Sequence, residues 1–580
     1  MGKSASTSTS ASTSTYAVWG WGEPDEEPQV NALEAMAPAL QALLGFPLQP
    51  PERPAPLPPL PAPRVTPPGQ LAACASADPL DRARHALGRS YRDLLRGLRG
   101  QIEHPPDLVL RPRSEAEVAA VLDWCAAARV ALVPFGGGTS VVGGVEPAIS
   151  SQDRFAGAVS LDLSALAGVT EVDPVARAAR VLAGTTGPAL EQQLAPHGLT
   201  LRFYPQSFQR ATVGGWLATR AAGHFATGAT HIDDLVESIR MLTPVGVSES
   251  RRLPASGAGP SPDRLALGSE GILGVITAAW LRVQPRPARR ARATVAFASF
   301  EAGAAAVRSI VQAGLAPANC RLVDAAEAAI TGTLATGEAV LLLGFEAIAP
   351  DLPLDAELAV ALALATQLGG HLTSSGAVDN QMQESHQNAR VRRGGGAAAP
   401  GEVQNRADVP GAGATGAWRA AFLRAPYLRE SLVLLGVLAE TFETAVTWDR
   451  LDGLVAGVRA AVGDALGRVC GGGTVTCRLT HAYPDGAAPY FTVLAPARRG
   501  SELTQWAEIK AAAAEAILAS GGTITHHHAV GRDHRPWYDR QRPDPFAHAL
   551  RAAKAALDPA GILNPGVLVD SRPPGHQCSR

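Results

Sequence analysis

A run of three glycines followed by two hydroxyl side chains, Gly136 to Ser140, most constrains what this chain can fold into. Glycine has no Cβ, so successive backbone N–H groups can face one concavity and neutralise a pyrophosphate without a steric penalty. By itself a glycine triplet is equally consistent with a plain tight turn. Two further glycine segments, 212–216 and 268–277, repeat the pattern. Together the three segments predict a flavin dinucleotide laid across three loops.

The residues before the first glycine run favour an α/β phosphate site. Ser114 to Leu122 reads as a helix with a capping box, and Ala131 to Pro134 as a short buried strand. A Rossmann site is disfavoured, because no G-x-G-x-x-G follows this strand and no helix is apparent after Ser140.

Length and composition limit the class of protein. A chain of 580 residues exceeds the size at which one core stops growing, so we expect two or more domains. With 46% hydrophobic residues, 18% charged residues and a formal charge of −2, nothing in the composition attracts nucleic acid. The six cysteines form no C-x-x-C pair, which predicts reduced and mostly buried thiols.

The N-terminal region carries no predicted packed element. Met1 to Ser6 fits a loose myristoylation pattern, but the Ser/Thr run to Thr15 is better explained as a disordered tail, and Pro47 to Pro68 as an extended linker. We expect neither secretion nor a transmembrane anchor, because no signal peptide is apparent and no apolar run reaches about 18 residues. The expected location is cytoplasmic.

The remaining sequence predicts two α+β domains. Strands at 158–163 and 178–183 precede a helix at 187–194, completing a two-lobed flavin domain that ends near Pro285. From Arg292 onward, strands alternate with covering helices, which suggests a second domain that closes over the flavin. Between 388 and 415 the chain is rich in Gly, Ala, Pro and Arg, which favours a mobile loop, and potentially a lid, over a second phosphate nest.

Three consecutive histidines, His526, His527 and His528, follow a segment that favours a strand. Strand alternation places His526 and His528 on one face and His527 on the other, so the three cannot easily bind one metal ion. An exposed polar edge and a partial zinc site are alternatives, but no supporting ligand is apparent and we predict no metal. Imidazoles titrate near neutrality, so a pair facing a flavin could move protons or hold an anion.

The order and spacing of these motifs resemble a known family. Four segments of this chain are similar to the FAD domain of the vanillyl-alcohol oxidase superfamily. They are Pro106–Pro112, Pro134–Ser140, Thr212–Trp216 and Gly268–Gly271. Within that superfamily, the second half of the chain resembles the alkyldihydroxyacetonephosphate synthases. The resemblance lies in Thr441–Thr444, Trp448–Arg450, Cys477–Thr480, Tyr490–Phe491 and His526–Gly531, with an additional similarity at Trp19–Gly22. The resemblance covers about Pro106 to Leu568.

This resemblance implies an α+β fold, with a two-lobed PCMH-type FAD-binding domain and an α+β cap domain for the substrate. The expected divisions are a disordered Ser/Thr- and Pro-rich region at 1–77, the FAD-binding domain at 78–290, the cap domain at 291–520 with its mobile loop at 388–415, and a C-terminal segment at 521–570 that completes the active site with the histidine run.

The resemblance also implies the residues that contact FAD. Thr139 holds the position at which covalently flavinylated members carry a histidine, so the expected FAD is noncovalent. The family has an acidic residue where this chain has Gln206, so one carboxylate contact is lost. The expected cofactor contacts are Pro134, Phe135, Gly136, Gly137, Gly138, Thr139, Ser140, Gln206, Ser207, Phe208, Gln209, Arg210, Ala211, Thr212, Thr219, Arg220, Ala221, Ala222, Glu270, Gly271, Ile272, Leu273, Gly274, Val275 and Ile276.

Three kinds of side chain are expected to act on the substrate. Tyr490 matches the family's acid/base tyrosine, although a tyrosine on a strand is by default core packing. Arg429 matches the substrate-binding arginine, whose guanidinium fork suits a phosphate, although a surface ion pair on a helix is the alternative. Arg321 matches a second important arginine, and the three histidines assist.

The activity implied by the resemblance is ether-lipid synthesis. The acyl chain of acyl-dihydroxyacetone phosphate is exchanged for a fatty alcohol, without net redox change of the flavin. A flavin dehydrogenase for D-lactate or D-2-hydroxyglutarate remains the alternative, and a nonenzymatic flavin-binding scaffold is disfavoured. Lipid substrates imply peripheral contact with a membrane, and we also expect a homodimer; no nucleic acid partner is expected.

Overall fold

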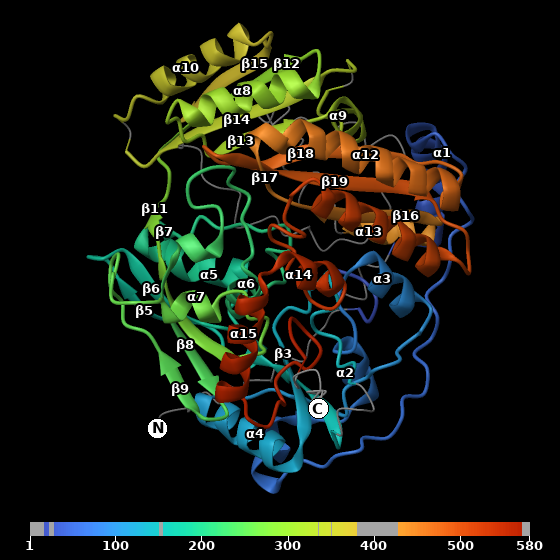
Figure 1. The fold of residues 1–580 in the computed structure, drawn as a ribbon, viewed down its shortest axis with the longest axis vertical. Coiled ribbons are helices and arrows are strands. Elements are labelled where there is room, and N and C mark those ends of the chain that lie inside the picture. Colours follow the sequence, from blue (N-terminus) through green and yellow to red (C-terminus); the bar gives the residue numbers. More distant parts are fainter. Residues whose placement is uncertain are drawn as a thin grey trace, which may run out of the picture.

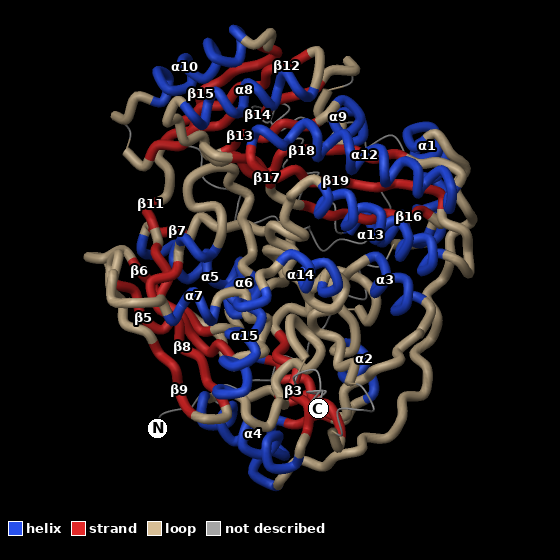
Figure 2. The backbone as a smooth tube through the Cα atoms, viewed as in Figure 1, coloured by secondary structure: helices blue, strands red, loops and turns tan. Residues whose placement is uncertain are grey.

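The computed structural model describes residues 17–22, 28–149, 155–334, 336–349, 351–379 and 427–570. Figure 1 shows the cap domain at the top and the flavin domain below it. Loop segments gather between the sheets of the two domains (Figure 2). The predicted mobile loop at 388–415 lies outside the described residues.

The first lobe of the flavin domain is a four-stranded sheet. Its order is β1 (Ala75–Ser76), β2 (Leu108–Leu110), β4 (Gly157–Asp162) and β3 (Val130–Phe135), with β2, β4 and β3 parallel. Helix α4 (Glu115–Ala128) packs on β3, and its first turn is capped by the Ser114 hydroxyl, which accepts the N–H of Glu117. The Glu117 carboxylate accepts from Arg113 N–H, so the predicted capping box is only half formed. Strand β3 ends at Phe135, directly before the glycine run.

The second lobe is an antiparallel sheet of five strands. Their order is β5 (Val169–Asp173), β6 (Ala178–Leu182), β10 (Val275–Arg282), β8 (Val236–Thr243) and β9 (Gly246–Glu249). The lobe also contains β7 (Leu199–Thr200), β11 (Gln284–Pro285), α5 (Gly187–Leu194), α6 (Val213–Thr219) and α7 (Pro262–Ala266). A core around Trp216 and Phe203 joins these helices to the sheet. The lobe therefore fixes α6, which begins at the second glycine segment.

The cap domain is built on one antiparallel sheet. Its order is β15 (His371–Asp379), β12 (Arg289–Phe297), β14 (Ala339–Ala347), β13 (Asn319–Val323), β18 (Thr474–Ala482), β19 (Gly486–Pro496) and β16 (Val437–Glu443), with β17 (Val446–Thr447) paired to β19. The helices that pack against it are α8 (Phe300–Gln312), α9 (Ala325–Ile330), α10 (Leu354–Gln367), α12 (Trp448–Cys470) and α13 (Glu502–Ala519). This arrangement agrees with the α+β fold expected from the sequence.

The N-terminal region is ordered where the structure describes it, so the expectation of disorder over 1–77 is wrong for residues 17–22 and 28–77. Helix α1 (Val30–Leu44) buries Leu33 in the cap core. The proline-rich segment that follows, residues 47–68, is called the strap and runs along the surface towards the flavin domain. It is held by backbone bonds, including Gln49 N–H to Leu435 O at 3.0 Å and Ala55 N–H to Leu98 O at 2.7 Å. Proline keeps the strap extended, and these contacts fix its path.

Three short helical segments follow the strap. Residues Gly69–Cys74 form the 3₁₀ helix η2, followed by α2 (Pro79–Arg84) and α3 (Tyr91–Leu98). Helix α3 packs against β16 of the cap domain, and Leu95 and Leu98 join the cap core. Further 3₁₀ turns are η4 (Leu163–Ala165), η5 (Ala195–His197) and η6 (Ile232–Asp234).

The C-terminal segment returns from the cap domain to the flavin domain. Its helices are α14 (Arg535–Gln541) and α15 (Asp544–Leu557). Beyond α15, the N–H of Leu132 on β3 donates to Ile562 O at 2.8 Å, and the N–H of Asn564 donates back to Leu132 O at 2.8 Å. The segment therefore adds a parallel bridge to the strand that precedes the glycine run.

The described cysteines agree with the expectation of reduced and mostly buried thiols. Cys74, Cys125, Cys320, Cys470 and Cys477 are free thiols, and three of them are buried. Cys578 lies outside the described residues. Among the described helices, none combines the length and the apolar character needed to cross a membrane.

We predict that Arg99→Met destabilises the protein by about 1–3 kcal/mol, because it leaves a buried carboxylate without its cation. Arg99 bonds Glu52 Oε1 of the strap at 3.0 Å and Glu502 Oε2 of α13 at 3.0 Å, and the Glu502 side chain is only 4% exposed. Urea unfolding measures the loss, and limited proteolysis reports release of the strap. The control is Arg468→Met, whose partner Glu508 is exposed and should contribute below about 1 kcal/mol. Equal effects of the two substitutions would contradict the prediction.

Candidate functional site

One elongated cavity lies between the flavin domain, the cap domain and the C-terminal segment. The empty volume of this cavity is about 1710 Å³, and part of that volume is open to solvent. The flavin domain supplies backbone-rich loops, whereas the cap and C-terminal segments supply charged and aromatic side chains. The latter are Arg321, Arg429, Thr441, Arg478, Thr480, His481, Tyr490, His527, His528 and Asn564.

The glycine run lies where no side chain fits. A Cβ on Gly136 would lie 2.3 Å from Thr212 Oγ1, and one on Gly137 would lie 2.2 Å from Arg210 O. Gly138 has φ +64°, a backbone conformation that favours glycine. Within the described part of the chain, the N–H groups of Gly137, Gly138 and Thr139 donate to no protein acceptor. These unpaired donors at a cavity wall fit a pyrophosphate, so the residues present suit FAD.

Two other segments close around the glycine run. Arg210 Nε donates to Gly137 O at 2.7 Å, and the Thr212 hydroxyl caps α6 by accepting the N–H of Gly215. Glu270 and Gly271 both have positive φ, and a Cβ on Gly271 would lie 2.8 Å from Pro134. The three glycine segments of the sequence therefore meet at one wall of the cavity.

The structure brings most of the expected FAD contacts to this cavity, but not all. The expected residues that line it are Pro134, Phe135, Gly136, Gly137, Gly138, Thr139, Ser140, Gln206, Ser207, Ala211, Thr212, Thr219, Ala221, Ala222, Glu270, Gly271, Gly274 and Ile276. Those that do not line it are Phe208, Gln209, Arg210, Arg220, Ile272, Leu273 and Val275. The last three are completely buried, because their side chains pack into the hydrophobic cores behind the cavity wall.

The strand predicted before the histidine run is absent. Residues 522–530 form an irregular loop, so the alternation that was expected to separate His527 from its neighbours does not apply. The rings of His526 and His527 lie 5.3 Å apart and those of His527 and His528 lie 4.8 Å apart, measured between centroids. The histidines therefore form one cluster. His527 and His528 line the cavity, and His526 lies behind them.

A buried carboxylate explains why this loop is not a strand. Glu443, at the end of β16, is 1% exposed. Its Oε1 accepts from the Thr525 hydroxyl at 2.7 Å and from the N–H groups of His527 and His528 at 3.0 and 2.8 Å. Its Oε2 accepts from His526 N–H at 2.6 Å. The backbone N–H groups that a β-ladder would use therefore donate to the Glu443 carboxylate instead, and the loop wraps around this side chain.

The histidines of the cluster are held neutral by burial. Burial lowers the pKa of His527 and of His528 to about 3, and in His528 the Glu443 carboxylate only partly opposes the shift. Burial and the neighbouring histidines lower the pKa of His526 and of His481 well below the usual value. A neutral imidazole offers one donor and one acceptor, which suits proton transfer better than the binding of an anion.

Tyr490 lies on β19 with its side chain at the cavity, rather than only in the core. It is 3% exposed, and its ring centroid lies 5.5 Å from that of His528 and 6.2 Å from that of His527. The Arg478 guanidinium carbon stacks 3.8 Å from the ring centroid, and Arg478 is paired with buried Glu327. The stacked cation therefore fixes the Tyr490 ring at the cavity wall.

The two arginines expected to bind substrate both line the cavity. Arg429, in a helix whose described part runs from 427 to 434, donates from Nη2 to the Thr441 hydroxyl at 2.9 Å. Arg321 on β13 donates to His224 Nδ1 at 3.3 Å and to His224 O at 3.2 Å. Burial lowers the pKa of Arg321 to about 9, which leaves it a cation at neutral pH. Together the two cations can hold a phosphate dianion.

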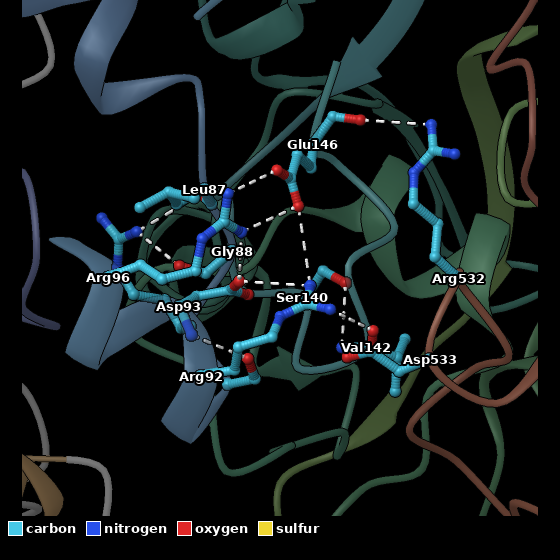
Figure 3. A network of polar contacts seen from close by, with 12 residues as sticks. Leu87, Gly88, Arg92, Asp93, Arg96, Ser140, Val142, Glu146, Arg532 and Asp533 are labelled. Carbon is cyan, nitrogen blue, oxygen red and sulfur yellow. Dashed lines mark hydrogen bonds and ion pairs between the residues drawn. The ribbon is translucent and has the colours of Figure 1, made fainter. Parts of the chain in front are cut away.

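An ion-pair network supports the loops on the flavin side (Figure 3). Arg96 of α3 donates from Nη2 to Glu146 Oε1 at 2.8 Å, and Arg92 Nη1 donates to Asp533 Oδ1 at 2.6 Å. The N–H of Asp533 donates to Val142 O at 3.1 Å. Because Val142 and Glu146 follow the glycine run and Asp533 follows the histidine loop, α3 ties these two loops together.

Several site residues were not identified from the sequence. Arg478 and Trp21 lie within segments that carried the family resemblance, but no role followed from either segment. His481, Thr441 and Asn564 also line the cavity, and Glu443 acts from behind the histidine loop. Thr441 and Glu443 also lie within a segment that carried the resemblance, whereas no sequence signal singled out His481 or Asn564, which reach the cavity through the pairing of β18 and the return of the C-terminal segment.

Two groups of side chains in the described structure have the ligand atoms for a metal ion. They are His481, His526 and His527, and Glu443, His527 and His528, with atoms within 4.8 Å of one another. Both Glu443 oxygens already accept the loop donors, and both His481 nitrogens contact Thr480 or Gly223. Binding a metal ion would compete with these bonds, so the absence of a metal stays our prediction.

Comparison with known proteins matches both domains to family models. Residues 106–249 match the model described as FAD binding domain, and residues 286–568 match the model described as FAD linked oxidases, C-terminal domain. A solved structure of an alkyldihydroxyacetonephosphate synthase superposes with a TM-score of 0.71 at 25% identity and covers 92% of each chain.

The relatives that match include both synthases and an oxidase subunit. Alkyldihydroxyacetonephosphate synthases of Trypanosoma brucei brucei and Caenorhabditis elegans are 28% and 29% identical to this chain, covering 86% and 83% of it and 78% and 79% of the relatives. The glycolate oxidase subunit GlcD of Escherichia coli (strain K12) is 27% identical over 82% of this chain and 85% of its own length.

We predict that Glu443→Gln lowers the free energy of unfolding by about 1–3 kcal/mol, because the amide nitrogen would face a backbone donor. Hydrogen exchange at the amides of 526–528 should become faster, which localises the effect to the histidine loop. Glu515→Gln is the control, since Glu515 is 54% exposed and bonded to exposed Arg540. Unchanged protection of the three amides would contradict the anchoring role.

We predict that the protein loses stability as the pH falls below 6.5. The histidines of the cluster have pKa values below those in the unfolded chain, so the unfolded state binds more protons between pH 6.5 and about 3. Each contributes up to about 1.4 kcal/mol per pH unit in this window. Glu270, whose pKa burial raises to about 7, opposes the trend. Urea unfolding at pH 7.5, 6.5 and 5.5 measures the slope, and His528→Gln should flatten it; an equal slope in this variant would contradict the prediction.

Proposed function

The chain is an alkyldihydroxyacetonephosphate synthase-like enzyme of the FAD-linked oxidase superfamily, and from this premise we propose that it makes ether lipids. The reaction replaces the acyl chain of acyl-dihydroxyacetone phosphate by a fatty alcohol and releases a fatty acid. The observation that carries the proposal is the convergence of Tyr490, Arg429 and Arg321 on one cavity with the glycine nest.

The flavin domain holds the cofactor mainly through backbone N–H groups. The N–H groups of Gly137, Gly138 and Thr139 would bind the pyrophosphate, and the cavity wall at Gln206, Ser207 and Ala221 would hold the rest of the dinucleotide. When bound, FAD supplies the electron-accepting ring at which the substrate carbon reacts. The binding is noncovalent, since a threonine stands where the covalently flavinylated family members carry a histidine. Acid precipitation should therefore leave the yellow colour in the supernatant; colour retained in the pellet would contradict this.

The cap domain holds and activates the substrate. Arg429 and Arg321 bind the phosphate by charge-assisted hydrogen bonds. Tyr490 moves a proton at the dihydroxyacetone carbon, and Arg478, stacked on its ring, holds the tyrosine in position. His527 and His528, neutral and beside Tyr490, accept or return that proton.

Three further properties belong to this proposal. The substrates are lipids, the protein is cytoplasmic and contacts a membrane peripherally, and it forms a homodimer. Flotation with vesicles that contain the acyl substrate and sedimentation of the purified protein test the last two. A monomer that stays with the soluble fraction would contradict both.

The decisive assay mixes the purified protein anaerobically with palmitoyl-dihydroxyacetone phosphate and labelled fatty alcohol while the flavin spectrum is recorded. Labelled ether without net flavin reduction is the expected result. Bleaching by D-lactate or D-2-hydroxyglutarate, without ether, would instead assign the protein to dehydrogenase chemistry. The similarity to a glycolate oxidase subunit makes this second outcome worth testing in the same experiment.

We predict that Tyr490→Phe lowers the exchange rate by about 10²-fold or more while FAD stays bound, because the variant keeps the ring and removes the hydroxyl. Exchange turnover and the flavin absorbance of the purified variant measure the two effects. Phe442→Leu, a substitution in the stacked pair behind the site, is the packing control and should retain most activity. Loss of flavin from Tyr490→Phe would make the tyrosine structural.

A further inference from the structure

A line of hydrogen-bonded side chains leads away from the cavity through the histidine cluster. His527 lines the cavity, and its Nδ1 lies 3.0 Å from Nδ1 of His526. The other ring nitrogen of His526, Nε2, lies 2.8 Å from the Tyr483 hydroxyl. The Tyr483 hydroxyl in turn lies 2.9 Å from Oγ1 of Thr230. His526 thus uses both ring nitrogens, one towards the cavity and one away from it.

The two ends of this line lie in different surroundings. At the inner end the His527 ring lies nearly parallel to the Tyr490 ring, with an interplanar angle of 20°. At the outer end Tyr483 is partly exposed, and it precedes the exposed residues Pro484 and Asp485. Asp234, which accepts from the N–H of Thr230 at 3.1 Å, is also exposed. The line therefore runs from the reacting groups to Tyr483 and the buried Thr230, next to a rim where carboxylates meet solvent.

Each member of the line can pass one proton on. If His527 Nδ1–H donates to His526 Nδ1, then His526 carries its proton on Nε2 and donates it to Tyr483, whose hydroxyl donates to Thr230. The reverse order is equally well bonded. Burial keeps both imidazoles neutral, so neither nitrogen of His526 is blocked by a resident second proton. Such a line conducts protons by successive short transfers.

The proposed reaction leaves one proton to be removed in each turnover. A bond forms between the alcohol oxygen and the dihydroxyacetone carbon, and the bond from that carbon to the acyl oxygen breaks. The alcohol loses its O–H proton, and the acyl group leaves as a fatty acid. A carboxylic acid has a pKa near 4, so at neutral pH it departs as carboxylate and the proton is surplus.

We infer that Tyr483, His526 and His527 form a proton relay that carries this surplus proton from the active cavity to solvent. The relay rests on the proposed function and adds to it two residues, Tyr483 and His526, that do not line the cavity. His526 was expected to be catalytic at the substrate; its position makes it the middle of the relay instead. Tyr483 is the residue through which the proton leaves.

The test follows ether formation and proton release together in weakly buffered solution with a pH indicator, using FAD-loaded protein. Wild type should release one proton per ether formed. Tyr483→Phe removes only the hydroxyl and should lower turnover by about 10-fold or more, with the KM for the acyl substrate and the flavin content unchanged. Added imidazole at millimolar concentration should restore turnover, because it accepts the proton from His526 directly. His526→Gln should show the same loss.

Trp448→Phe is the matched control. The indole Nε1 of Trp448 donates to Tyr483 O at 2.9 Å, so this variant disturbs the same turn without touching the relay, and turnover should stay near that of wild type. A Tyr483→Phe variant as active as wild type, or one whose loss imidazole does not restore, overturns the relay and leaves the synthase assignment standing. A wild-type protein that makes no ether overturns both.

Discussion

The buried carboxylate of Glu443 is the interaction on which the site depends. It ends strand β16, faces Tyr490 across the β16–β19 ladder, and accepts four donors from the loop that carries the histidines. A carboxylate this deeply buried is stable only if its oxygens are fully bonded, and a loop with three consecutive free N–H groups is stable only if it finds acceptors. Each therefore requires the other, and their pairing fixes the C-terminal segment against the cap sheet.

Charge at the cavity is divided between its two walls. The flavin domain offers backbone donors without side chains, because Gly136 and Gly137 lie too close to Thr212 and Arg210 for a Cβ. The cap domain offers guanidinium groups that differ in their contacts. Arg478 pairs with buried Glu327 and stacks on Tyr490, whereas Arg321 contacts His224 and Arg429 contacts Thr441. The proposed function assigns Arg321 and Arg429 to the phosphate of the substrate and Arg478 to the tyrosine.

The sequence predicted the elements around the glycine run well, because a capped helix, an apolar strand and three glycines are local signals. Strand β3 and helix α4 lie close to where they were expected. Two expectations were wrong for a common reason. The strand before His526 and the disorder of residues 28–77 were inferred from local composition, whereas the partners that decide both, Glu443 for the loop and Leu435 and Leu98 for the strap, lie far away in sequence.

The sequence by itself determined that the chain has a flavin-type glycine wall and which tyrosine, arginines and histidines to consider, since these follow from residue types and their order. The tertiary structure alone decided which of them meet. Tyr483 and His526 come within 2.8 Å although 43 residues separate them, and Arg478 stacks on Tyr490 because β18 and β19 pair in that register. Register and loop closure are set by packing over the whole domain, and so no local pattern encodes them.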